Sequence, residues 1–86
     1  MRFKRTERFA EAYRSLQQDI RLKVDKTLRL LAADPRHPSL HLKKIEGTAG
    51  IWEARVDRQH RMTLEIAEGY YLLRNVGKHD ETLGKP

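Results

Sequence analysis

The sequence predicts an α+β domain in which a helical hairpin packs on one face of a small, mainly antiparallel, twisted sheet, in the order β-α-α-β-β-β. In the first half of the chain, apolar residues recur at spacings of three and four, which is typical of amphipathic helices. In "WEARVDRQHRMTLEI", residues 52–66, apolar and polar residues alternate, which is typical of half-buried strands. A length of 86 residues suits one domain, so we expect residues 1–86 to fold as a single unit.

The helical hairpin is expected to follow a short edge strand that "MRFKR" forms around Phe3. Thr6 is the expected N-cap of a short helix over "TERFAEAYRSL". A second helix is expected from about Gln17 to Ala33, because one apolar stripe runs along it: Leu16, Ile20, Val24, Leu28 and Leu31. It ends at Asp34, since a residue before proline is biased away from helical geometry.

The remaining strands follow this hairpin. "SLHLKKIEGTAG" is expected to be extended and to lead to a turn at residues 47–50, and the strands of residues 52–66 turn near "DRQH". "YYLLRNV" is a last strand, apolar on both faces and therefore interior, and "GKHDETLGKP" is a polar tail without a regular element. Parity places Tyr71 on the polar face, unless a bulge reverses it, and leaves Arg74 on the apolar face without an explanation.

The amino-acid composition excludes several classes of function and favours others. The chain has 18 basic and 12 acidic residues, a net charge of +6, which favours an anionic partner. It has no cysteine, so disulfides and thiolate chemistry are excluded, and its histidines lack metal-binding spacing, so no metal or cofactor is expected. No apolar run approaches the roughly 20 residues that span a bilayer, and the N-terminus lacks the apolar core of a signal peptide. We therefore expect a cytoplasmic protein.

One sheet face is expected to carry chemistry. Two helices cover only one face of a sheet, so the other is expected to be open, with Glu53, Arg55, Arg61 and Thr63 on it. Lys78 and His79 of "VGKH" would reach its rim. Such a set suits metal-free RNA cleavage by the 2′-hydroxyl: the arginines stabilise the charge of the transition state, while Glu53 and His79 divide the proton transfers. The alternative is a cross-strand salt-bridge ladder, in which each exposed pair contributes about 0–1 kcal/mol.

The pattern "LHLKKIEGTAGIWEARVDRQHRMTLEI…YYLLRNVGKHDE" resembles the RelE/ParE superfamily of bacterial type II toxins. With the helical hairpin, the resemblance covers nearly the whole chain. It implies a RelE/ParE-like fold, a cognate antitoxin as partner and, in the RelE-like branch, an endoribonuclease that cuts messenger RNA in the ribosomal A site.

The resemblance also implies site residues. The basic residues of the RelE-like branch fall on Arg55, Arg61 and His79, whereas Glu53 stands where that branch often has another basic residue. The tyrosine that often follows the terminal basic residue is replaced within "DETLGKP". Two alternatives therefore stay open: a ParE-like poison of DNA gyrase, which lacks the nuclease set, and a basic RNA-binding module without chemistry.

Other residues are candidates for binding RNA, the ribosome or an antitoxin. RNA or ribosome contacts are expected from exposed cations: Lys43, Lys44, Arg58 and Lys78; a solvated basic surface is the alternative for each of them. Leu22 and Ala33 lie off the apolar stripe of the second helix, so they are candidates for antitoxin binding. Trp52 is expected in the core and His60 at the surface of a turn.

Overall fold

A five-stranded sheet lies at the centre of the structure, a computed structural model that describes residues 2–86. The elements follow the chain in this order: β1 (Arg2–Arg5), α1 (Glu7–Ser15), α2 (Gln18–Ala33), a 3-10 turn η1 (Pro38–Leu40), β2 (Lys43–Lys44), β3 (Ile51–Arg55), β4 (His60–Ala67), β5 (Tyr70–Lys78) and α3 (His79–Gly84). The strand order is β1-β5-β4-β3-β2, with β1 parallel to β5 and every other pair antiparallel. The predicted α+β class is confirmed, and β5 is an interior strand as expected.

The helical hairpin forms where the periodicity predicts it. The Thr6 hydroxyl accepts a hydrogen bond from the Phe9 amide at 3.0 Å and caps α1. The Tyr13 hydroxyl donates to Asp25 of α2 at 2.7 Å, and this bond joins the two helices and raises the pKa of Tyr13. Within residues 2–86, no helix is both long enough and apolar enough to cross a bilayer.

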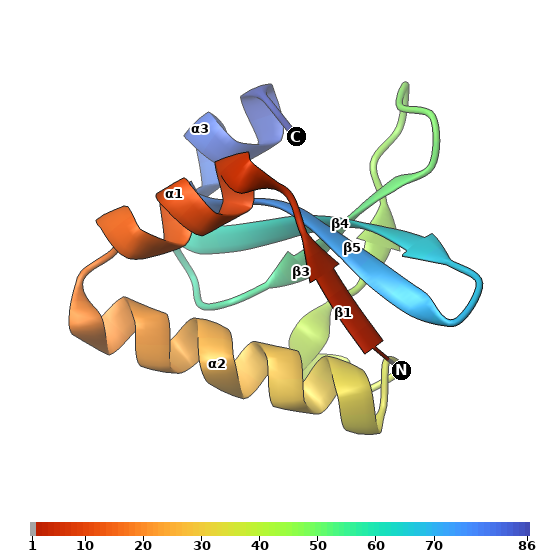
Figure 1. Ribbon diagram of the computed structural model, residues 1–86, viewed down its shortest axis with the longest axis horizontal. Helices are drawn as coiled ribbons and strands as arrows, with labels where there is room; N and C mark the ends of the chain where they lie inside the picture. The colour runs from red at the N-terminus through yellow and green to blue at the C-terminus, as the bar shows by residue number, and fades with distance from the viewer. Residues whose placement is uncertain (1) are drawn as a thin grey trace.

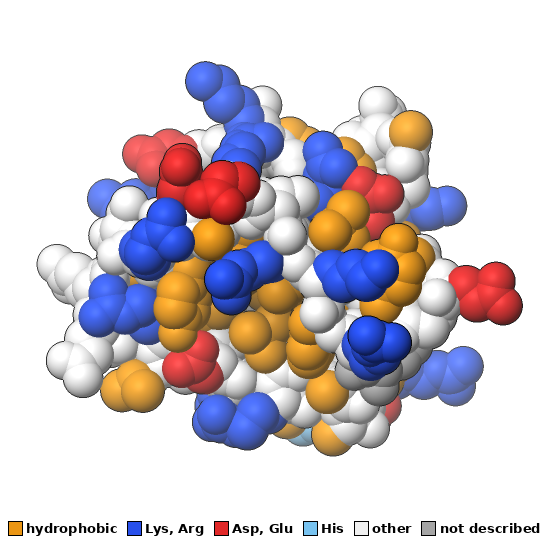
Figure 2. Space-filling model, in the orientation of Figure 1, with side chains coloured by type: hydrophobic (Ala, Val, Ile, Leu, Met, Phe, Trp, Pro, Cys, Tyr) orange, Lys and Arg blue, Asp and Glu red, His pale blue; other side chains and the backbone are white. Residues whose placement is uncertain are grey.

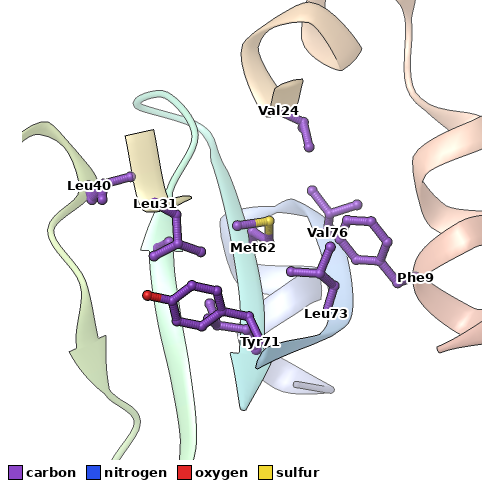
Figure 3. Packing of buried hydrophobic residues seen from close by; sticks show 10 residues of the cluster. Phe9, Val24, Leu31, Leu40, Met62, Tyr71, Leu73 and Val76 are labelled. Carbon is purple, nitrogen blue, oxygen red and sulfur yellow. The ribbon is translucent and has the colours of Figure 1, made fainter. Parts of the chain in front are cut away.

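The core lies between α1, α2 and one face of the sheet (Figure 3). Val24 and Leu31 of α2 are fully buried, and they belong to one cluster with Phe9 of α1 and Met62 and Leu73 of the sheet. Burial of each such side chain contributes about 1.5–3 kcal/mol relative to exposure. Trp52 is partly buried and packs against this cluster, as expected.

A bulge in β5 changes which side chains reach each face. Thr63 pairs with Asn75 and Leu64 pairs with Leu73, so Arg74 is the extra residue between them. One extra residue reverses the alternation of the strand. Tyr71 therefore points into the core and is 4% exposed, so the bulge reverses its parity-based placement on the polar face, which the prediction named as the exception. The guanidinium of Arg74 contacts the carboxylate of Glu65 on the polar face, and this explains its position.

The expectation of an irregular tail is wrong, because residues 79–84 form α3. Figure 1 shows α2 on one side of the sheet and α3 on the other. Thr82 of α3 is 1% exposed, and a Cβ on Gly77 would lie 3.0 Å from its hydroxyl. The Thr63 hydroxyl donates to the Pro86 carbonyl at 3.0 Å. The sheet face expected to be open is therefore covered in its middle by α3 and the residues after it.

Candidate functional site

Arg55 and Arg61 lie directly opposite one another in the β3–β4 pair. Residues paired across antiparallel strands share a sheet face, so both side chains leave the sheet on the side away from α2. On its other side, Arg61 pairs with Gly77, two residues before His79. The strands thus bring together three of the four expected catalytic residues at the end of the sheet nearest to the β3–β4 turn.

The guanidinium of Arg61 bends back onto this turn. Its Nη1 donates to the Asp57 carbonyl at 2.7 Å and to the His60 carbonyl at 3.0 Å. An arginine has five N–H donors, so the Nε and Nη2 donors are left for another acceptor. Within residues 2–86, Arg55 has no hydrogen-bonded or ion-paired side-chain partner and is half-buried. The two guanidinium groups therefore offer donors to an anion at this point of the surface.

The turn that holds Arg61 is closed by the carboxylate of Asp57. One carboxylate oxygen accepts from the Gln59 and His60 amides, each at 2.8 Å, and from Nδ1 of the His60 ring at 2.9 Å. The other accepts from Lys23 of α2 at 3.2 Å. Burial alone acts to raise the pKa of the Asp57 carboxyl, but the bonds from His60, Gln59 and Lys23 outweigh it and hold that pKa well below 3.8.

His60 is buried, so its expected place at the surface is wrong. It is 8% exposed and starts β4 opposite Lys78. The ring forms part of the wall of a groove of about 790 Å³ between the helical hairpin, the β3–β4 turn and α3. The spacing of Asp57 and His60, three residues apart around a turn, is the signal in the sequence that could have found this pair.

His79 is the first residue of α3 and is tied to the same turn. Its amide donates to the Gln59 carbonyl at 2.8 Å. Its Nδ1 lies 2.8 Å from a carboxylate oxygen of Asp80, and the side chain is 47% exposed. The imidazole is therefore oriented by a carboxylate through one nitrogen, and the other is available for proton transfer.

Glu53 lies on the same face but is more enclosed than the arginines. It pairs with Thr63, is 8% exposed and lies 3.9 Å from the Lys43 ammonium. Neither Arg55 nor Arg61 forms an ion pair with it among residues 2–86, so the alternative of a salt-bridge ladder through these arginines is not what the structure has.

The remaining basic candidates are spread over both faces. Lys43 is next to Glu53 on the face of the arginines, and Arg58 is exposed in the turn. Lys44 lies over the Trp52 ring at 6.0 Å from its centre, and Lys78 pairs with His60. By register, Lys44 and Lys78 belong to the opposite face, so the expectation that Lys78 shares the face of Arg61 is wrong.

Leu22 and Ala33 lie apart from this site, on α2. Leu22 is 61% exposed, and Ala33 is exposed three helical turns further along the same side. A second apolar area lies beside β1, where a cleft of about 540 Å³ is lined by Phe3, Phe9, Tyr13 and Leu28, with Lys4, Arg5 and Arg14 around it. Figure 2, which has the orientation of Figure 1, shows hydrophobic side chains gathered in the middle of the molecular surface, among lysines and arginines.

Across residues 2–86, no three His, Asp or Glu side chains are arranged to hold a metal ion.

Solved structures of other proteins share the fold of this chain. The YoeB/ParE toxin from Agrobacterium tumefaciens matches 92% of this chain and 99% of its own, with a TM-score of 0.78 and 16% identity. This is the fold of the RelE/ParE toxins. The predicted RelE/ParE-like architecture is confirmed.

Two other structures with the RelE/ParE fold have similar TM-scores to this chain. YafQ from E. coli strain BL21(DE3) matches 95% of this chain and 98% of its own, with a TM-score of 0.80 and 12% identity. The intact E. coli RelBE toxin-antitoxin complex contains a chain that matches with a TM-score of 0.72 and 18% identity, over 91% of this chain and 95% of its own. No family model matches the sequence, and neither does any curated protein.

Proposed function

We propose that this chain is the toxin of a type II toxin–antitoxin system and a RelE-like endoribonuclease. It cleaves messenger RNA in the ribosomal A site and so inhibits translation in the cytoplasm. The observation that carries the proposal is the pairing of Arg55 with Arg61, next to a turn to which the backbone of His79 is also bound. The RelE/ParE fold supports it.

The proposed reaction uses the 2′-hydroxyl of the message as the nucleophile. A base takes its proton, the oxygen attacks the adjacent phosphorus, and the 5′-oxygen leaves with a proton from an acid. The products are a 2′,3′-cyclic phosphate and a 5′-hydroxyl end. Arg55 and the free donors of Arg61 bind the non-bridging oxygens, whose charge increases in the transition state. The half-exposed ring of His79 performs one proton transfer, and Glu53 is the candidate for the other.

The proposed partner is a cognate antitoxin that binds α2 from outside. Leu22, Lys26, Arg29 and Ala33 are exposed and follow one another at spacings of four, three and four residues along the helix. An amphipathic segment with acidic residues complements such a basic stripe. Lys43 and Arg58 are the proposed contacts to ribosomal RNA on the side of the site, and Lys44 and Lys78 are proposed contacts from the other face.

The test is to map the ends of cellular messages after brief expression of the protein. We expect new 5′-hydroxyl ends with the wild type, and a loss of about 100-fold or more in cleavage with Arg61→Ala or His79→Ala. Arg36→Ala and His41→Asn are the controls, because both residues are exposed in the segment after α2, and asparagine tolerates the positive φ of 44° at residue 41. Wild-type cleavage by both site variants would refute the assignment.

Two observations favour a ParE-like gyrase poison as the second candidate. Glu53 places a carboxylate on the face where the message would bind, and residues 80–86 contain no tyrosine. A supercoiling assay with purified gyrase distinguishes the two candidates, because a gyrase poison inhibits supercoiling and leaves messages intact. A basic RNA-binding module would bind RNA in a salt-dependent manner and produce no new 5′-hydroxyl ends.

A further inference from the structure

The turn at residues 57–60 contacts both the candidate arginine and the candidate histidine. The carbonyls of Asp57 and His60 accept from Nη1 of Arg61 at 2.7 and 3.0 Å. The Gln59 carbonyl, which lies between them in the turn, accepts from the His79 amide at 2.8 Å. Three carbonyls of one short turn therefore hold two residues that come from different elements, β4 and α3.

The directions of these carbonyls depend on how the turn is closed. A single oxygen of the Asp57 carboxylate accepts from two amides of the turn and from the His60 ring. The ring is not free to leave, because the His60 side chain is only 10% exposed. Lys23 binds the second carboxylate oxygen and thereby joins the turn to α2. Nδ1 can donate to Asp57 in the neutral Nδ1–H tautomer and in the charged ring alike.

We propose that Asp57 and His60 are positioning residues of this site. Their contact fixes the turn, the turn carbonyls fix the guanidinium of Arg61 and the backbone of His79, and the free donors of Arg61 thereby face the scissile phosphate. Neither residue contacts the message. The proposal rests on the proposed function, and it adds two residues that act on the reaction only through Arg61 and His79.

The test uses two changes at residue 60 that differ in one donor. His60→Asn keeps an N–H donor close to the position of Nδ1, whereas His60→Leu places an apolar side chain of similar size in the groove and removes the donor. Asp57→Ala removes the acceptor. Its matched control is Asp34→Ala, because Asp34 also closes a turn, by accepting from the Arg36 amide at 3.0 Å, but in the exposed segment after α2.

Cleavage is measured in single turnover on ribosomes carrying a synthetic message, beside the affinity for those ribosomes. We expect His60→Leu and Asp57→Ala to lose about 10- to 100-fold in rate at saturation, as expected for a misplaced catalytic group, with affinity changed less than about twofold. His60→Asn recovers most of the rate, and Asp34→Ala matches the wild type. A purely structural role predicts equal loss in His60→Asn and His60→Leu, and that result overturns the proposal.

A second measurement does not depend on any activity. In ¹⁵N spectra of the folded protein, His60→Leu should move the Nε–Hε signal of Arg61, because the carbonyls that hold Nη1 of the same guanidinium are no longer fixed. It should also speed exchange of the His79 amide by about tenfold or more, because the Gln59 carbonyl that this amide binds is no longer fixed. Unchanged signals overturn the positioning role, even if the wild type cleaves RNA. If the wild type cleaves no RNA, the proposed function fails, and these spectra still decide whether the pair positions Arg61. If Asp57→Ala does not fold, the two His60 variants decide.

Discussion

Arg55 and Arg61 are paired across two strands, yet their surroundings differ. Arg61 is bound to carbonyls of the turn, whereas no side-chain partner binds Arg55 among residues 2–86. A guanidinium fixed in direction suits two-point binding of a phosphate, and a free one can follow the substrate as it binds. We therefore infer different roles for them: Arg61 for orientation, Arg55 for attraction and charge.

The ionised carboxylate of Asp57 stabilises the β3–β4 turn. Its pKa is held well below 3.8, so its stabilising effect is fully present above pH 4 and is lost as the pH falls through the lowered pKa. Asp57→Asn should therefore lower the free energy of unfolding by about 1–2 kcal/mol at pH 7, because charge-assisted hydrogen bonds are lost. Urea unfolding at pH 7 and at pH 3 measures this, and the gap between variant and wild type should narrow at pH 3.

The control for this prediction is Asp34→Asn, in the exposed turn after α2, which we expect to change the free energy of unfolding by less than about 0.5 kcal/mol. A gap for Asp57→Asn that is equally large at both pH values would show that its ionisation does not stabilise the fold.

Helix α3 and the residues after it decide how much of the sheet is accessible. They cover Thr63, and the Asn75 amide and the Arg8 guanidinium both donate to the Lys85 carbonyl. The paired arginines lie beyond this cover, at the end of β3 and the start of β4, and both are half-buried. The site is therefore a rim between α3 and the β3–β4 turn, rather than a whole open face.

The fit of α3 depends on a glycine in β5. A Cβ on Gly77 would lie 3.0 Å from the Thr82 hydroxyl, closer than an ordinary contact. We expect Gly77→Ala to destabilise the fold by about 1–3 kcal/mol through overpacking, and we expect part of this loss to disappear in the double variant with Thr82→Ala. Urea unfolding of the single and double variants gives the coupling energy.

Gly84→Ala is the matched change for this cycle, since nothing lies within 4 Å of a Cβ built there. If Gly77→Ala is as mild as Gly84→Ala, or if its effect simply adds to that of Thr82→Ala, α3 does not pack on Gly77 as described.

Charge is spread over the entire protein, and this bears on RNA binding. The net charge is +6, and basic residues lie on both sheet faces, on α2 and around the cleft beside β1. Such a distribution attracts an anionic polymer from many directions, so attraction alone does not orient it. We infer that orientation comes from the few cations at the rim of the site.

Salt dependence separates the two contributions. We expect the affinity for a short 2′-O-methyl RNA, which lacks the nucleophile, to fall steeply with salt, and we expect Arg55→Ala to reduce the slope of log affinity against log salt by about 0.7. The slopes are measured by fluorescence anisotropy titrations at salt concentrations from about 50 to about 200 mM. Arg36→Ala, on the exposed segment after α2, is the control. Equal slopes for both variants would show that Arg55 does not contact the bound RNA.

The order of elements from β1 to β5 and the position of the arginines were readable in the sequence because both depend on near neighbours in the chain, whereas α3 was not predicted. Helical periodicity placed α1 and α2, and Gln18, where α2 begins, is one residue from the prediction. Alternation in the hairpin placed Arg55 and Arg61 on one face, since the register of a hairpin is set by its own short turn.

The cover of that face and the burial of its turn were decided only in the tertiary structure. The pairing of β5 with β4 leaves Arg74 as the extra residue of a bulge, and because of this bulge the Tyr71 side chain points into the core. His60 and Asp57 are enclosed because α2 brings Lys23 and the groove wall to them, and Thr63 is buried by residues near the end of the chain. The pattern of apolar residues in a sequence does not show whether a given polar side chain is buried. A polar side chain contacts water or another residue depending on segments that are distant in the sequence and close in the fold.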